Sequence, residues 1–105
     1  MAKKRAIRVT SSTGNVFRDL GFSKEESEHL LIRADLLIQV QKAIVSRSLK
    51  QAEAAKILRV TQPRVSDLLR GRIDLFSTDS LIDMLARLGV GVRLVVKTPR
   101  SKKVA

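Results

Sequence analysis

One stretch of the chain, residues 49–71, constrains its fold more than any other part. It reads LKQAEAAKILRVTQPRVSDLLRG and contains two short helix-like segments separated by a tight break. The second segment opens with Thr61, Gln62 and Pro63. Threonine is a suitable N-cap, and proline fits the first helical turn because its missing N–H would have no partner there. This layout predicts a helix-turn-helix, a motif whose second helix enters the major groove of DNA.

The composition agrees with one small helical domain. The chain has 105 residues, of which 44% are hydrophobic, and its only aromatic residues are three Phe. Aliphatic side chains must therefore form the core, and few rings are available to stack on single-stranded bases. The absence of Cys excludes disulfides and thiolate metal sites, and a cytoplasmic location is expected. No stretch approaches the roughly 18 apolar residues of a membrane-spanning helix.

The formal net charge of +11 is concentrated at the two ends of the chain. Residues 1–18 hold five bases, residues 86–105 hold six bases, and neither segment holds an acid. The part between them is neutral, but within it residues 47–72 hold seven bases and two acids. A basic motif with basic arms is typical of a surface that faces phosphates, although a solubilising surface with disordered tails would carry the same charge.

Apolar residues recur at three- and four-residue spacing through the middle of the chain, which predicts amphipathic helices. We expect helices over residues 23–47, 51–58, 62–70 and 78–88, after a short helical turn at 15–22. The longest begins with Ser23 and Glu26 at the spacing of a capping box. Its inward stripe is expected to consist of Leu30, Leu31, Ala34, Leu37, Ile38, Ile44 and Val45.

Residues 90–97 alternate with a period of two, which predicts a single strand. The side chains expected on one face of this strand are Val90, Val92, Leu94 and Val96. A lone strand leaves its backbone groups unpaired, so it needs residues 6–10, a second copy of itself or another protein's sheet edge. Pairing between two copies would make a symmetric dimer, and its DNA operator would be a palindrome.

The polar face of the second motif helix supplies the candidate DNA contacts. Base reading is assigned to Gln62, Pro63, Ser66 and Asp67, because glutamine can form two hydrogen bonds to adenine and proline can contact a thymine methyl. Asp67 has a second interpretation, an ion pair with Arg64 or Arg70. Most protein–DNA hydrogen bonds go to the backbone, so phosphate binding is assigned to Gln51, Thr61, Arg59, Arg64, Arg70 and Arg72.

These segments resemble the Cro/cI-type (XRE) helix-turn-helix family. The resemblance covers about residues 30–88 and rests on QAEAAKIL, Val60 of the turn, TQPRVSDLLRG and SLIDMLARLG. It implies a mainly α, five-helix DNA-binding domain. Together with the charge and periodicity of the chain, this divides the sequence into a basic arm and helical turn at 1–22, the DNA-binding domain at 23–89, and a strand and basic tail at 90–105, with the strand expected to serve in dimerisation. NVFRDLGF and QPRVSDLLRGR are, more narrowly, similar to HigA-type antitoxins, which bind a small ribonuclease toxin and repress their own operon.

Two residues depart from the family pattern. Lys50 stands where the family usually has Thr or Ser, and the lost helix cap is expected to cost about 1 kcal/mol unless Ser48 replaces it. Arg59 stands at the usual Gly of the turn. If its φ is positive, a non-glycine residue there costs roughly 1 kcal/mol or more.

Three functions fit the sequence. The first is a homodimeric repressor that binds double-stranded DNA and neutralises a toxin, and the second is a free-standing XRE-type regulator without a toxin. The third is an interaction module whose basic surface meets an acidic protein. Catalysis is not expected, and neither is a cofactor or a metal, because His29 is the single histidine and the glutamates beside it suit the positive end of a helix.

Overall fold

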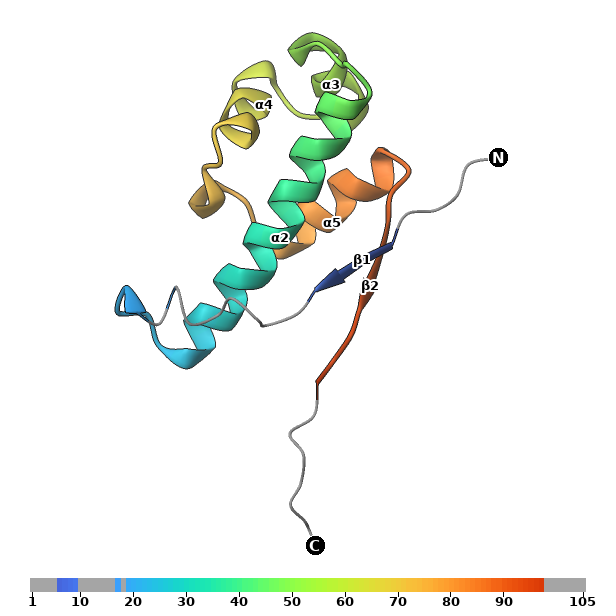
Figure 1. The fold of residues 1–105 in the computed structure, drawn as a ribbon. Helices are drawn as coiled ribbons and strands as arrows, with labels where there is room; N and C mark the ends of the chain where they lie inside the picture. Colours follow the sequence, from blue (N-terminus) through green and yellow to red (C-terminus); the bar gives the residue numbers. More distant parts are fainter. Residues whose placement is uncertain (1–5, 10–16, 18, 98–105) are drawn as a thin grey trace, which may run out of the picture.

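The computed structural model describes residues 6–9, 17 and 19–97, and Figure 1 shows their arrangement. The elements along the chain are β1 (Ala6–Val9), α2 (Lys24–Ser46), α3 (Gln51–Leu58), α4 (Gln62–Leu69), the 3-10 helix η1 (Ile73–Leu75), α5 (Thr78–Arg87) and β2 (Gly91–Leu94). The described ranges thus contain four α-helices and one 3-10 helix, whereas the family resemblance implied five helices. Residues 1–5, 10–16, 18 and 98–105 lie outside the described residues, so parts of both basic arms and three residues of the predicted turn at 15–22 are not described.

Helix α2 begins at the predicted capping box. The Glu26 N–H donates to Ser23 Oγ at 3.1 Å, and the Ser23 N–H donates to Glu26 Oε1 at 3.0 Å. The helix is 23 residues long, and its N-terminal part extends beyond the bundle formed with α3, α4 and α5 (Figure 1). The predicted inward stripe is wrong at two positions, since Ile38 is 44% exposed and Val45 is 69% exposed. The buried face of α2 instead carries Leu31, Leu36, Leu37, Val40 and Ile44.

The core lies between α2 and the three shorter helices and is almost entirely aliphatic. Its fully buried side chains include Leu36, Val40, Ala54, Leu58, Val65, Leu68, Leu81 and Leu85. Leu69 of α4 and Ile82 of α5 are half-buried at the edge of this core. Phe76, which follows η1, is also buried and belongs to the same core.

Long side chains from neighbouring helices bind the backbone at three helix C-termini. Gln41 Nε2 donates to the Leu68 carbonyl at 2.8 Å, Arg47 Nη1 to the Leu88 carbonyl at 3.1 Å, and Arg87 Nη1 to the Leu58 carbonyl at 3.2 Å. The last carbonyls of a helix have no partner within it, so these bonds satisfy groups that would otherwise need water. They also fix the directions in which α3, α4 and α5 end.

The predicted C-terminal strand is present, and its partner is the first strand of the same chain. β1 and β2 are parallel, with Ala6 opposite Gly91 and Val9 opposite Leu94. The strand is shorter than predicted, because Val90 precedes it and Val96 follows it. Leu94 and Val96 are 58% and 83% exposed, so this end of the chain presents apolar side chains to solvent.

None of the helices in the described part of the chain is long and apolar enough to cross a membrane.

Candidate nucleic-acid interface

The turn between α3 and α4 has the geometry that the sequence predicts. Arg59 ends α3 in the left-handed conformation, with φ 60° and ψ 44°. An L-residue in this conformation costs about 1–2 kcal/mol, so this arginine strains the turn where glycine would not. Thr61 is the N-cap of α4, and its Oγ1 accepts the Arg64 N–H at 3.3 Å. Pro63 lies in the first turn, as predicted.

At the start of α3, only one of the two hydrogen bonds of a capping box is present. Its N-cap residue is Lys50, whose side chain cannot accept a hydrogen bond. Glu53 reaches back instead, and its Oε1 accepts the Lys50 N–H at 2.8 Å. Ser48 does not take the N-cap position and lies two residues earlier, with φ 52°. The helix therefore keeps half of a capping box and leaves the N–H groups of its first turn, including that of exposed Gln51, available to an anion.

Helix α4 divides into an apolar face that packs on the bundle and a polar face that points outward. Val65 and Leu68 are fully buried, while Gln62 and Pro63 are exposed at the N-terminal end. Ser66 and Asp67 are half-buried along the polar face. The predicted outward orientation is therefore confirmed. The base contacts assigned to these four residues remain predictions.

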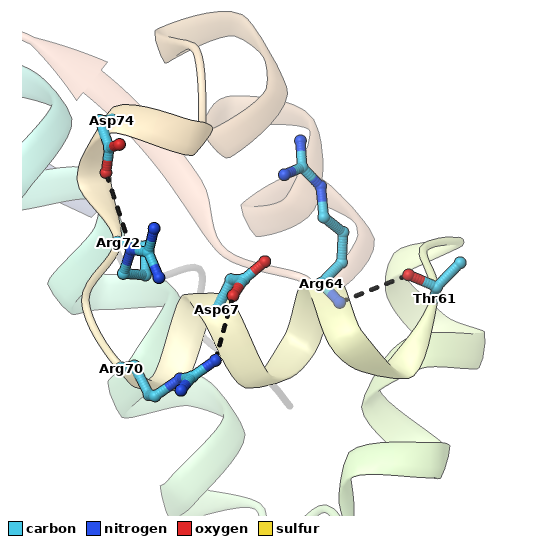
Figure 2. A network of polar contacts seen from close by, with 6 residues as sticks. All are labelled: Thr61, Arg64, Asp67, Arg70, Arg72 and Asp74. Atoms are coloured by element: carbon cyan, nitrogen blue, oxygen red, sulfur yellow. Dashed lines mark hydrogen bonds and ion pairs between the residues drawn. The ribbon is translucent and has the colours of Figure 1, made fainter.

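Two arginine–aspartate pairs lie along α4 and the loop that follows it (Figure 2). Arg70 Nη2 lies 3.5 Å from Asp67 Oδ1, and Arg72 Nε lies 4.0 Å from Asp74 Oδ1. The ion-pair interpretation of Asp67 is thus confirmed, with Arg70 as the partner. Exposed pairs of this kind contribute only about 0–1 kcal/mol, so a DNA phosphate can draw the arginine away at little cost.

These features together form a helix-turn-helix with an exposed recognition face, and comparison with known proteins gives the same result. A family described as "Helix-turn-helix domain" matches residues 16–97. The chain belongs to this helix-turn-helix family. A solved structure described as "Putative XRE Family Transcriptional Regulator" shares 32% sequence identity with it, at a TM-score of 0.67. The match covers 76% of this chain and 91% of that one, so the helix-turn-helix is of the XRE type. No curated protein matches the chain.

The arginines of this XRE-type domain fall into two groups. Arg59, Arg70 and Arg72 are exposed around the ends of α3 and α4, and the phosphate contacts assigned to them remain predictions. Arg64 is different, because its guanidinium is bound inside the protein. Its Nη2 donates to the Leu75 carbonyl at 3.0 Å, and its Cζ lies 4.6 Å from the centroid of the Phe76 ring. In Figure 2 its side chain points away from the Asp67–Arg70 pair.

His29 and the glutamates beside it lie near the start of α2. Among the described residues, no three His, Cys, Asp or Glu side chains lie close enough together to hold a metal ion. Elsewhere on α2, burial raises the pKa of the Asp35 carboxyl above its ordinary value of 3.8. Asp35 lies on α2 and belongs to neither helix of the motif.

Proposed function

We propose that the chain is a sequence-specific DNA-binding transcriptional repressor. The observation that carries this proposal is the division of α4, whose apolar residues are buried while Gln62 and Pro63 stand exposed at its N-terminal end. In helix-turn-helix proteins the N-terminal residues of the recognition helix are the ones that reach base edges. Gln62 would bind an adenine, Pro63 a thymine methyl, and Ser66 and Asp67 the next base edges along the groove.

Phosphate contacts would surround this base-reading end. Arg59 lies in the turn before α4, and Arg70 and Arg72 lie at its other end. Gln51 and Thr61 begin α3 and α4, where free N–H groups and the positive end of the helix dipole favour an anion. These contacts fix the orientation of the protein on the duplex and carry no sequence information by themselves.

The test is a mobility-shift titration with the DNA upstream of the chain's own gene, against a scrambled duplex of equal length and composition. A repressor of this kind binds the upstream DNA at least about a thousandfold more tightly than the scrambled duplex. Binding to both should weaken steeply with salt, because phosphate contacts release counterions. Equal affinity for the two duplexes would refute sequence-specific repression. No salt-dependent binding to either would favour the interaction module with an acidic protein partner.

The proposed repressor is a homodimer, and β2 is the element proposed to join its subunits. β1 occupies one edge of β2, and no described residue pairs with the other edge. An unpaired strand edge beside exposed Leu94 and Val96 suits a second copy of the same strand. Sedimentation equilibrium at micromolar concentration tests this, because a protein that remains monomeric there would not have this interface.

We further propose that the repressor is a HigA-like antitoxin, with a small ribonuclease toxin as its partner. The similarity of the NVFRDLGF segment to such antitoxins supports this, together with the exposed apolar side chains of Leu20 and Phe22. The test is co-expression with any small basic protein encoded next to the chain, followed by co-purification. Without such a neighbour, the free-standing XRE-type regulator is the remaining function.

A further inference from the structure

Arg64 lies two residues after Gln62 in the first turn of α4, yet both its backbone and its side chain are bound within the protein. Its N–H donates to the Thr61 hydroxyl, and its Nη2 donates to the Leu75 carbonyl at 3.0 Å. Its guanidinium carbon Cζ lies over the Phe76 ring, 4.6 Å from the ring centroid. Phe76 is only 2% exposed, so the ring is fixed in the core. A single side chain therefore ties the base-reading end of α4 to the connection between η1 and α5.

We propose that Arg64 is a positioning residue, which holds the first turn of α4 at the angle that presents Gln62 and Pro63 to the bases. The proposal rests on the DNA-binding function proposed above. It replaces the phosphate contact that sequence reasoning assigns to Arg64.

The chemistry of the contact explains why arginine is needed. A guanidinium is planar and carries five donors, so it can lie over an aromatic ring and donate to a carbonyl at the same time. A lysine ammonium keeps the charge but is a compact point charge without a flat face. A hydrogen-bonded pair between glutamine and adenine depends on distance and direction, so a small tilt of the first turn of α4 would weaken it.

Arg70 supplies the contrast. It follows on the same helix, its side chain is 65% exposed, and its partner Asp67 is 3.5 Å away in a solvent-exposed pair. It is free to exchange that pair for a phosphate. Arg64 would have to give up both the Leu75 carbonyl and the Phe76 ring to do the same.

The decisive variant is Arg64→Lys, with Arg70→Lys as its matched control. Both preserve charge, so the salt slope of binding should remain that of the wild type. Arg64→Lys should lower the ratio of operator to scrambled-duplex affinity by roughly tenfold, within the range of one lost two-bond base contact. Arg70→Lys, at a proposed phosphate contact, should weaken binding to operator and scrambled duplex alike and therefore change their ratio far less than Arg64→Lys does. The proposal is overturned if Arg64→Lys keeps the full ratio while Arg64→Ala flattens the salt slope by about 0.9, because that is the behaviour of a phosphate contact.

Two further variants separate positioning from general destabilisation. Phe76→Leu keeps an apolar side chain in the core but removes the aromatic face, so it should lower the same ratio. In a double-mutant cycle, the combined effect of Phe76→Leu and Arg64→Lys should be smaller than the product of the two. In a Gln62→Ala background, Arg64→Lys should cause little further loss of discrimination. Independent effects in both cycles would contradict the proposal.

NMR spectra of the protein without DNA test the contact of Arg64 with Leu75 and Phe76 independently of DNA binding. In Arg64→Lys and in Phe76→Leu, the amide resonances of residues 61–66 and 73–77 should shift together, while those of α3 stay in place. Unchanged resonances in residues 61–66 would overturn the positioning role, whatever the protein binds. If the wild type fails to discriminate its operator but these shifts appear, it is the proposed function that is wrong, and the structural link stands.

Discussion

Arg87 of α5 donates a hydrogen bond from Nη1 to the carbonyl oxygen of Leu58, the last residue of α3, at 3.2 Å. The next residue, Arg59, has a positive φ, and Thr61 then begins α4. The bond therefore ties the helix-turn-helix to α5 at the C-terminal end of α3. The direction of the recognition helix depends on this contact as well as on the residues of the turn.

Replacing Arg87 with alanine should lower the free energy of unfolding by about 1–2 kcal/mol, because a partly buried carbonyl loses a charged donor. Urea denaturation followed by circular dichroism measures this, and the midpoint should fall with an unchanged slope. The matched control is Arg93→Ala, which removes the same side chain from an exposed position on β2. Equal midpoints for the two variants would show that the Arg87 contact adds no stability.

Arg59→Gly should separate the stability of the turn from its affinity for DNA. Glycine relieves the left-handed strain but adds flexibility to the unfolded chain, so the net gain in stability should be about 0.5–1 kcal/mol. Loss of the charge should weaken binding to every duplex and reduce the salt slope by about one unit.

The control for this turn is Arg59→Ala, which removes the charge and keeps the strain. It should lose the same DNA affinity as Arg59→Gly without any gain in stability. If the glycine variant binds DNA as tightly as the wild type, Arg59 does not contact a phosphate.

Gln62→Ala should remove the preference for one base pair. The expected loss is about 1–3 kcal/mol of binding to the operator, with little change for a scrambled duplex. Thermal stability should stay the same, because Gln62 is exposed. Titration of operator variants with each base pair changed in turn locates the position that Gln62 reads.

Arg70→Ala should affect DNA binding in the opposite way to Gln62→Ala, by lowering affinity without changing base preference. It should weaken operator and scrambled duplex alike and reduce the salt slope by about one unit. A Gln62→Ala protein that binds its operator normally would show that the recognition helix is misassigned.

Asp35→Asn should stabilise the fold at neutral pH. Burial raises the pKa of the Asp35 carboxyl above 3.8, so the folded state disfavours its ionised form. The cost is present once pH rises above the raised pKa, and it disappears as pH falls below the unfolded value. The melting temperature of Asp35→Asn should therefore exceed that of the wild type at pH 7 and match it near the acid end of the titration. A gain that is equal at all pH values would point to a cause other than ionisation.

Signals between near neighbours in the sequence predicted most of the fold. Ser23 and Glu26, three residues apart, identified the start of α2, and Thr61 and Pro63 identified the start of α4. The period of the apolar residues separated helices from the strand. The spacing of apolar residues did not predict that Ile38 and Val45 are exposed. The apolar stripe of α2 is wider than the surface that the other helices cover, and the sequence does not show which side of the stripe they cover.

The sequence did not predict the contacts between residues that lie far apart in the chain. Gln41, Arg47 and Arg87 each bind a carbonyl more than 25 positions away, and a long polar side chain on a helix has the same sequence pattern whether it faces water or a neighbour. Arg64 was assigned to phosphate for this reason. In the structure its guanidinium contacts Leu75 and Phe76, which belong to a connection whose path depends on the whole bundle.

The parallel pairing of β1 with β2 makes the two ends of the chain dependent on each other. Truncating the N-terminus through β1 would remove the strand that pairs with β2. Both edges of β2 would then be unpaired instead of one. A fusion partner attached directly ahead of Ala6 would likewise begin next to the first residue of β2, because Ala6 lies opposite Gly91. Studies of self-association in this protein are therefore best made with the tag at neither end.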